Sequence, residues 1–211
     1  IMKIYGVVYG SKTTDFEPYF NSNPAKPYLF ENNAMVDIVQ NFLDGVDDND
    51  WIGVFSPKFT IKTGFDKNAV YRTLENSKSD VVNFTRWKSN LHFMRWSNSG
   101  HPNIIEFIKL CCNHVGLKYN NEPNPIIFSI QFAARKHIYV DYINSVIIPC
   151  IKLFETELWD RVNVSAGYTA GLELTKLKEL TGLDFYNYVP FILERMAMQY
   201  FENKKINVYT P

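Results

Sequence analysis

The chain has few cysteines, and their spacing fits neither a zinc site nor a set of disulfides. Cys111, Cys112 and Cys150 are an odd number, with no Cys-x-x-Cys pair and no Cys/His spacing suited to zinc. We expect buried thiols in a reducing compartment, the cytoplasm. No charged leader followed by an apolar stretch opens the sequence, and its apolar runs are far shorter than the roughly 20 residues that span a bilayer. We therefore expect no transmembrane segment.

The sequence also lacks an excess of either charge. Lys plus Arg and Asp plus Glu both number 22, so no overall field attracts nucleic acid or an anionic membrane. The common motifs Gly-x-x-x-x-Gly-Lys, Gly-x-Gly-x-x-Gly, Gly-x-Ser-x-Gly and His-Glu-x-x-His are absent. Their absence disfavours P-loop hydrolases, dinucleotide-dependent dehydrogenases, serine esterases and zinc peptidases.

Aromatic residues, by contrast, are abundant. The chain has 16 Phe, 13 Tyr and 4 Trp among 211 residues, which is more ring surface than a core of this size requires. A length of 211 residues favours one domain, 1–211, over two. Some of the rings are therefore expected to line a cleft.

Strand-like and helix-like segments alternate along the chain, which predicts an α/β fold with parallel β-α-β units. The expected strands are 2–9, 51–55, 80–84 and 126–132. The expected helices are 33–43, 67–75, 102–114, 136–154 and 191–201. The polar and aromatic stretch 87–100 is typical of an active-site loop.

Basic residues follow the predicted strands, at the edge of a parallel sheet where ligands bind. The candidates are Ser11 and Lys12 after the first strand, Ser56, Lys58 and Lys62 after the second, Arg86 and Lys88 after the third, and Arg135 and Lys136 after the fourth, and all but the two serines are basic. Fixed cations in such a cleft stabilise the charge of a diphosphate leaving group. For each residue taken alone, an ordinary solvated side chain is an equal alternative.

Several carboxylates are candidates for metal binding or catalysis. Asp47, Asp48 and Asp50 resemble an Asp-x-Asp metal motif, but they precede a strand and so fall at the amino edge, where a solvated turn is favoured. Asp80 is the best single candidate for a metal ligand, and either Asp80 or Glu194 is expected to be the catalytic carboxylate. Glu194 and Arg195 interrupt an apolar helix, so they form either a structural ion pair or a substrate-facing group.

His101 and several rings complete the expected site. His101 follows an aromatic stretch and opens a helix, where it serves either as a base or phosphate donor or in a structural role. The flat side chains of Tyr9, Trp87, Phe93 and Trp96 suit stacking on a base or a sugar, although core packing is the commoner fate of any single ring.

The chain resembles a family of bacterial and viral glycosyltransferase-like proteins associated with surface and capsular polysaccharide synthesis. Three segments carry the resemblance: Trp51-Ile-Gly-Val-Phe-Ser-Pro-Lys-Phe59 with Lys62-Thr-Gly64, Phe128-Ser-Ile-Gln-Phe-Ala-Ala134, and Val189-Pro-Phe-Ile-Leu-Glu-Arg-Met196. The Asp80-Val-Val-Asn-Phe84 strand and the His101-Pro102 step are also similar. Gln131 stands where the family usually has Asn in a sugar-contacting position.

The resemblance implies a nucleotide-diphospho-sugar transferase fold of the GT-A type, with a mixed, mainly parallel open sheet flanked by helices. It implies transfer of a sugar from a UDP- or GDP-type donor to a carbohydrate acceptor, with Mn²⁺ or Mg²⁺ as a candidate cofactor that no clear motif supports. Two alternatives stay open. One is a carbohydrate-binding or assembly module that no longer turns over, and the other is a structural protein that uses its rings for protein contacts.

Overall fold

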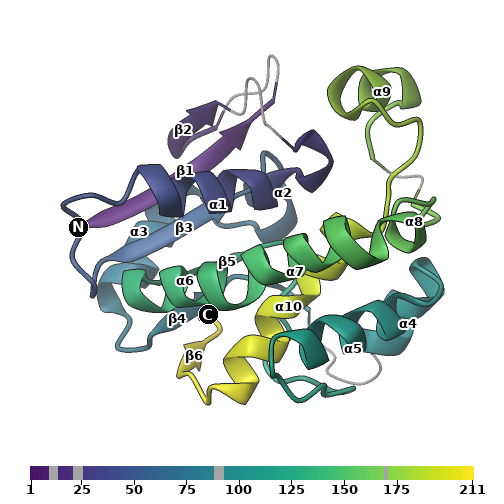
Figure 1. Cartoon of the computed structure of the whole chain (residues 1–211). Coiled ribbons are helices and arrows are strands. Elements are labelled where there is room, and N and C mark those ends of the chain that lie inside the picture. Colours follow the sequence, from purple (N-terminus) through teal and green to yellow (C-terminus); the bar gives the residue numbers. More distant parts are fainter. Residues whose placement is uncertain (10–13, 21–25, 88–92, 169–170) are drawn as a thin grey trace.

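The computed structural model describes residues 1–9, 14–20, 26–87, 93–168 and 171–211. It is an α/β structure in which helices flank a six-stranded mixed sheet (Figure 1). The strands are β1 (Met2–Val8), β2 (Glu17–Phe20), β3 (Trp51–Phe55), β4 (Val81–Asn83), β5 (Phe132–Arg135) and β6 (Val208–Tyr209). Their order in the sheet is β2-β1-β3-β5-β4-β6.

Only β5 runs against the other described strands. It pairs antiparallel with β3 and with β4, whereas β1 pairs parallel with β2 and β3, and β4 pairs parallel with β6. The predicted strand 126–132 is wrong in place and direction. Ser129 and Ile130 have a φ of 54°, which no strand allows, and the segment bonds instead to the side chains of Asn83 and Thr85.

The helices form a thick layer on one face of the sheet and a thin layer on the other. The thick layer contains α1 (Glu31–Asn41), α4 (Phe93–Gly100), α5 (Ile104–His114), the long helix described below and α10 (Val189–Asn203). The thin layer contains α2 (Phe59–Thr63) and α3 (Lys67–Asn76), whose apolar residues pack with Phe16, Phe55 and Phe84. The short helix η1 (Pro27–Leu29) precedes α1, and α9 (Leu174–Thr181) stands apart from the other helices in Figure 1.

A long helix crosses the sheet and runs further than the sequence predicts. It consists of α6 (Lys136–Tyr142), η2 (Ile143–Ile147), α7 (Ile148–Leu153), η3 (Phe154–Leu158) and α8 (Trp159–Val162), of which η2 and η3 are π-helical. Pro149 is the second residue after the first π-helical segment. A π-helical turn changes the hydrogen-bond pattern that a proline inside an α-helix disrupts, so the helix continues through Pro149.

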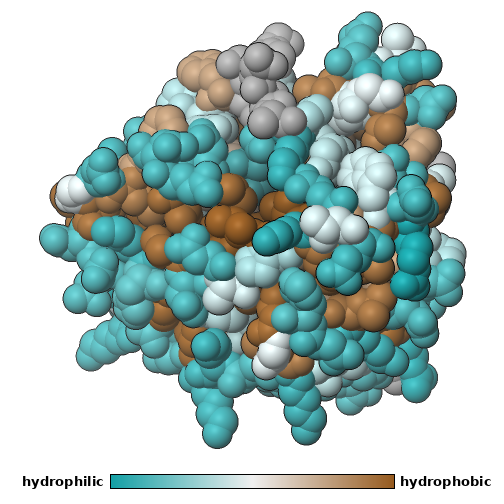
Figure 2. Space-filling view, viewed as in Figure 1, coloured by the Kyte–Doolittle hydropathy of each residue, from teal (hydrophilic) through white to brown (hydrophobic). Residues whose placement is uncertain are grey.

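The expectation of an active-site loop over 87–100 is wrong for residues 93–100. Residues 93–100 form α4, because Phe93, Met94 and Ser97 recur at helical spacing and are buried against the core. None of the helices in the described part of the chain combines the length and apolarity that crossing a lipid bilayer requires. The face shown in Figure 2 is mostly hydrophilic, with apolar residues reaching the surface between α1 and the long helix.

Candidate functional site

A pocket of about 620 Å³ lies at the sheet edge where β1 and β3 end and β5 begins. Tyr9 follows β1, Ser56 follows β3, and Ser129 precedes β5, and all three line the pocket. Because β5 is reversed, the segment before it reaches the same edge as the segments after the parallel strands. Side chains from α1, α2, α4, α9 and α10 form the remaining walls.

Charged side chains of both signs line this pocket. Its basic members within the described residues are Lys58, Lys62, Lys176 and Arg195, and its carboxylates are Glu31 and Glu194. Lys62 donates a hydrogen bond from Nζ to Ser129 Oγ at 3.2 Å. Ser56 Oγ is buried and has no hydrogen-bond partner within the described part of the chain. A hydroxyl in that state beside two lysines suits contact with a polar ligand.

Glu194 is the carboxylate with the most perturbed protonation. Its side chain is 18% exposed, and one of its oxygens lies 3.8 Å from a guanidinium nitrogen of Arg195. Burial raises the pKa of Glu194 to about 7, and Glu31 adds to the rise, while Arg195 and Lys62 oppose it. A carboxyl with a pKa near neutrality exchanges protons readily at physiological pH, as a general base must.

Arg195 is held inside the pocket wall rather than extended into the pocket. Its side chain is 1% exposed, Nε donates to Ser97 Oγ at 2.9 Å, and a terminal nitrogen donates to Phe191 O at 2.6 Å. Burial lowers the pKa of Arg195 to about 10, and Glu194 opposes that shift, so the guanidinium is charged at neutral pH. It ties α10 to α4 and lies beside the carboxylate of Glu194.

His101 lines the same pocket in its neutral form. Its Nδ1 lies 2.9 Å from Ala166 O, and because a carbonyl only accepts, the ring donates there and leaves Nε2 unprotonated. Burial is the main cause of its lowered pKa, and Arg195 lowers it further. The ring stacks on Phe191 at 4.0 Å between centroids. His101 can therefore accept a hydrogen bond from a ligand.

A wall of aromatic rings that the sequence analysis did not single out forms the other side of the pocket. The rings are Phe30, Tyr168, Tyr186 and Phe191. Tyr186 is fixed by a hydrogen bond from Leu172 N to its hydroxyl at 2.6 Å. The backbone at Gly171 approaches it closely, because a Cβ there would lie 2.2 Å from Tyr186 Oη. Two glycines next to these rings, Gly167 and Gly171, are the signal that the sequence offers for this wall.

Several predicted site residues within the described part of the chain do not line this pocket. Arg86 is exposed and lies over the Phe65 ring at 5.8 Å. Trp87 packs against Phe93 and Trp96. Gln131 is buried, and its carbonyl accepts from Phe84 N at 2.7 Å. Of the rings that were expected to stack on a ligand, Trp96 does line the pocket.

Asp80 lies at the opposite edge of the sheet, because it precedes β4. Its backbone forms hydrogen bonds with Asn207 and Arg135. Among the described residues, no group of three His, Cys, Asp or Glu side chains is placed to hold a metal ion. The divalent metal implied by the resemblance therefore finds no ligand cluster in this part of the chain.

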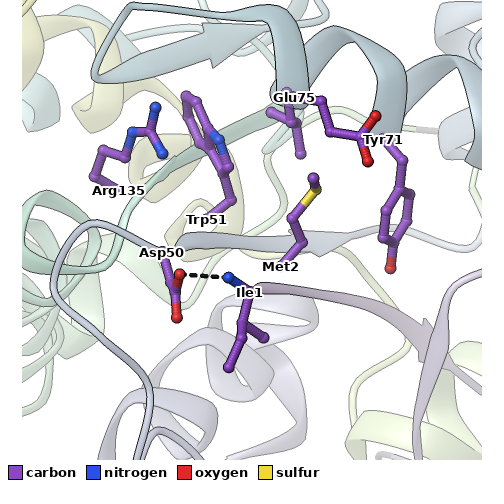
Figure 3. Close-up of a pocket in the computed structure, with 8 residues that line it drawn as sticks. Ile1, Met2, Asp50, Trp51, Tyr71, Glu75 and Arg135 are labelled. Carbon is purple, nitrogen blue, oxygen red and sulfur yellow. Dashed lines mark hydrogen bonds and ion pairs between the residues drawn. The ribbon is translucent and has the colours of Figure 1, made fainter.

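Arg135 and Lys136 also lie at that opposite edge, since β5 is antiparallel, so the expectation that they join the ligand-binding rim is wrong. Figure 3 shows Arg135 beside Trp51, with its guanidinium 3.9 Å from the ring centroid, in a separate hollow of about 370 Å³. Lys136 lies 3.5 Å from Asp48 of the acidic turn. The acidic turn 47–50 therefore lies beside Arg135 and Lys136, at the sheet edge opposite the pocket.

The remaining candidates Ser11, Lys12 and Lys88 lie outside the described residues.

Comparisons with protein-family models, with curated proteins and with solved structures give no match for this chain. The function is therefore inferred from the pocket itself.

Proposed function

We propose that the chain is a glycosyltransferase that moves a sugar from a nucleotide-diphosphate donor, with a UDP-sugar first among the donors, to a carbohydrate acceptor. The observation that carries the proposal is one pocket in which Lys58 and Lys62 stand with Glu194, a carboxyl whose pKa lies at about 7. Cations for a leaving diphosphate and a base for an attacking hydroxyl are the two groups that sugar transfer requires.

Each group has a distinct task in this mechanism. Glu194 takes the proton from the acceptor hydroxyl as its oxygen attacks the anomeric carbon of the donor. The bond between that carbon and the diphosphate oxygen breaks, and the electron pair leaves with the diphosphate. Lys58 and Lys62 stabilise the charge that develops there. Arg195 acts as a positioning residue, because it stays in the wall and its hydrogen bond to Ser97 ties α10, the helix that carries Glu194, to α4.

The architecture is consistent with the proposal. The sheet is mixed and mainly parallel, with helices on both faces, and the pocket lies at the carboxyl edge of β1 and β3. That edge is where open α/β sheets bind their ligands. The proposal includes a transferase fold of the GT-A type and a surface glycan as the product.

Calorimetric titration with UDP, GDP, CMP and their sugars, with and without Mn²⁺, tests donor binding, and nucleotide release tests turnover. Lys58→Ala and Lys62→Ala should each weaken diphosphate binding about tenfold or more, since a hydrogen bond to a charged group is lost. Lys152→Ala, which removes an exposed lysine of α7, is the matched control and should bind normally.

Glu194→Gln should bind the donor and release no nucleotide. Binding to none of the nucleotides would refute the proposal. Glycan binding without nucleotide release in the wild type would favour the carbohydrate-binding module instead.

A further inference from the structure

The aromatic wall of the pocket is built of rings inclined to one another. The ring of Phe30 stacks on Tyr186 with centroids 5.5 Å apart, and the ring of Tyr168 stands at 89° to Tyr186 with centroids 5.2 Å apart. Phe191 lies 5.1 Å from Tyr168 at 55°. Rings at such angles can enclose a small group from several directions, whereas a single flat ring offers one face.

No cation of the described chain lies over any of these four rings. The guanidinium of Arg195, the nearest candidate on α10, lies over Phe128 at 5.4 Å and Phe93 at 6.0 Å instead. The cation–ring contacts of the described residues involve other aromatic side chains throughout. No side-chain cation of the described residues therefore competes for these rings. One face of Phe191 is covered by the His101 ring, whereas Tyr168 is 39% exposed and stacks on none of its described ring neighbours, so its negative face suits a cation from a ligand.

Two carboxylates flank the same rings. Glu31 follows Phe30 directly and begins α1, and Glu194 lies one helical turn after Phe191 on α10. Both carboxylates line the pocket together with the rings. Aromatic faces combined with carboxylates attract a soft organic cation and repel a phosphate. The ring wall therefore offers a ligand a different chemistry from that of the Lys58 and Lys62 side chains in the same pocket.

We propose that the ring wall with Glu31 and Glu194 binds an alkylammonium group of the sugar substrate. The inference rests on the proposed function, and it narrows the substrate class to sugars that carry a positively charged nitrogen. Two sources supply that chemistry: the free amine of an amino sugar, and a choline-type trimethylammonium substituent. Either group would place the sugar beside Glu194, the proposed base.

The direct test compares choline with 3,3-dimethylbutan-1-ol, which has the same shape and no charge. Titration followed by NMR at pH 8 and one fixed, low ionic strength measures the two affinities, because salt screens an electrostatic contact. Choline should bind at least about fivefold more tightly than the neutral alcohol. Glucosamine against glucose distinguishes the amino-sugar source in the same way.

Variants separate ring and charge contributions. Tyr168→Leu should reduce the preference for choline, while Tyr168→Phe, which keeps the ring, should retain it; Tyr168 is 39% exposed, so both variants should fold. Lys176→Met should tighten choline binding, because it removes a like charge from the lining. Glu194→Gln should weaken choline and leave the neutral alcohol unchanged.

Equal binding of choline and its neutral analogue, or binding of neither ammonium probe, would overturn the inference. Nucleotide titration on the same sample keeps this result separate from the proposed function. If nucleotides bind and ammonium compounds do not, only the ammonium subsite is wrong. If choline binds and nucleotides do not, the transferase proposal fails while the subsite stands.

Discussion

Replacing Glu194 with Gln should make the folded protein more stable at pH 8 and change its stability little at pH 5. The carboxyl has a pKa of about 7 in the folded protein, mainly because it is buried, and titrates at its ordinary 4.5 in the unfolded chain. The folded state therefore binds the proton more tightly. Between these two pKa values, stability falls as the pH rises. Gln keeps the shape of the neutral carboxyl and has no charge to bury.

The size of the effect follows from the two pKa values. Because one pKa unit corresponds to about 1.4 kcal/mol, the difference between 4.5 and about 7 is worth about 3 kcal/mol at pH 8. Urea denaturation of the wild type and of Glu194→Gln at pH 5 and pH 8 measures this directly. Gln should lead by less than about 1 kcal/mol at pH 5 and by up to about 3 kcal/mol at pH 8.

Glu179→Gln is the control, because Glu179 is exposed on α9 and lies outside the pocket. Its effect on the free energy of unfolding should be the same at both pH values. If Glu194→Gln also gives the same difference at pH 5 and pH 8, the argument is refuted, because the carboxylate would then carry no net penalty for its charge in the folded state.

Three further predictions concern activity and local structure. If Glu194 is the base, kcat/KM of sugar transfer should rise with pH through about 7, and a pH–rate profile without that rise would exclude this role. Gly171→Ala should displace Tyr186, whose hydroxyl a Cβ would meet at 2.2 Å, and lower stability by about 1–3 kcal/mol in thermal unfolding. Asp66→Ala removes the side-chain cap on Ala69 N (2.7 Å) and should destabilise α3 by about 1 kcal/mol with nucleotide affinity unchanged; altered affinity would show that α3 acts on the pocket.

The regular strands could be predicted from the sequence, and the reversed strand could not. The segments 2–9 and 51–55 are rich in β-branched and aromatic residues, and they form β1 and β3. The segment 126–132 has a similar composition, but positive φ angles at Ser129 and Ile130 turn the chain before it pairs. The strand β5 is instead Phe132–Arg135, which includes two alanines of low β-propensity. Pairing with β3 and β4 decides its position, and a single sequence does not reveal such long-range contacts.

The site residues, like the strands, could be predicted only where the strand before them runs in the expected direction. Searching after the parallel strands located Ser56, Lys58 and Lys62, because the strand before them runs as predicted. The same search misplaced Arg135, because its strand runs in the opposite direction. The aromatic wall was missed because Phe30 and its partners lie on segments that follow no strand and reach the pocket only through tertiary packing.

The neighbours of Glu194 explain why its pKa lies near neutrality rather than at either extreme. Burial alone would keep the carboxyl protonated, and a fully formed ion pair would keep it ionised. Arg195 lies 3.8 Å away and donates its hydrogen bonds to Ser97 and Phe191 instead, so its attraction only partly offsets the loss of water. Ionisation of Glu194 therefore destabilises the folded state. For the same reason its carboxylate takes up a proton more readily than an ordinary glutamate, as a general base must.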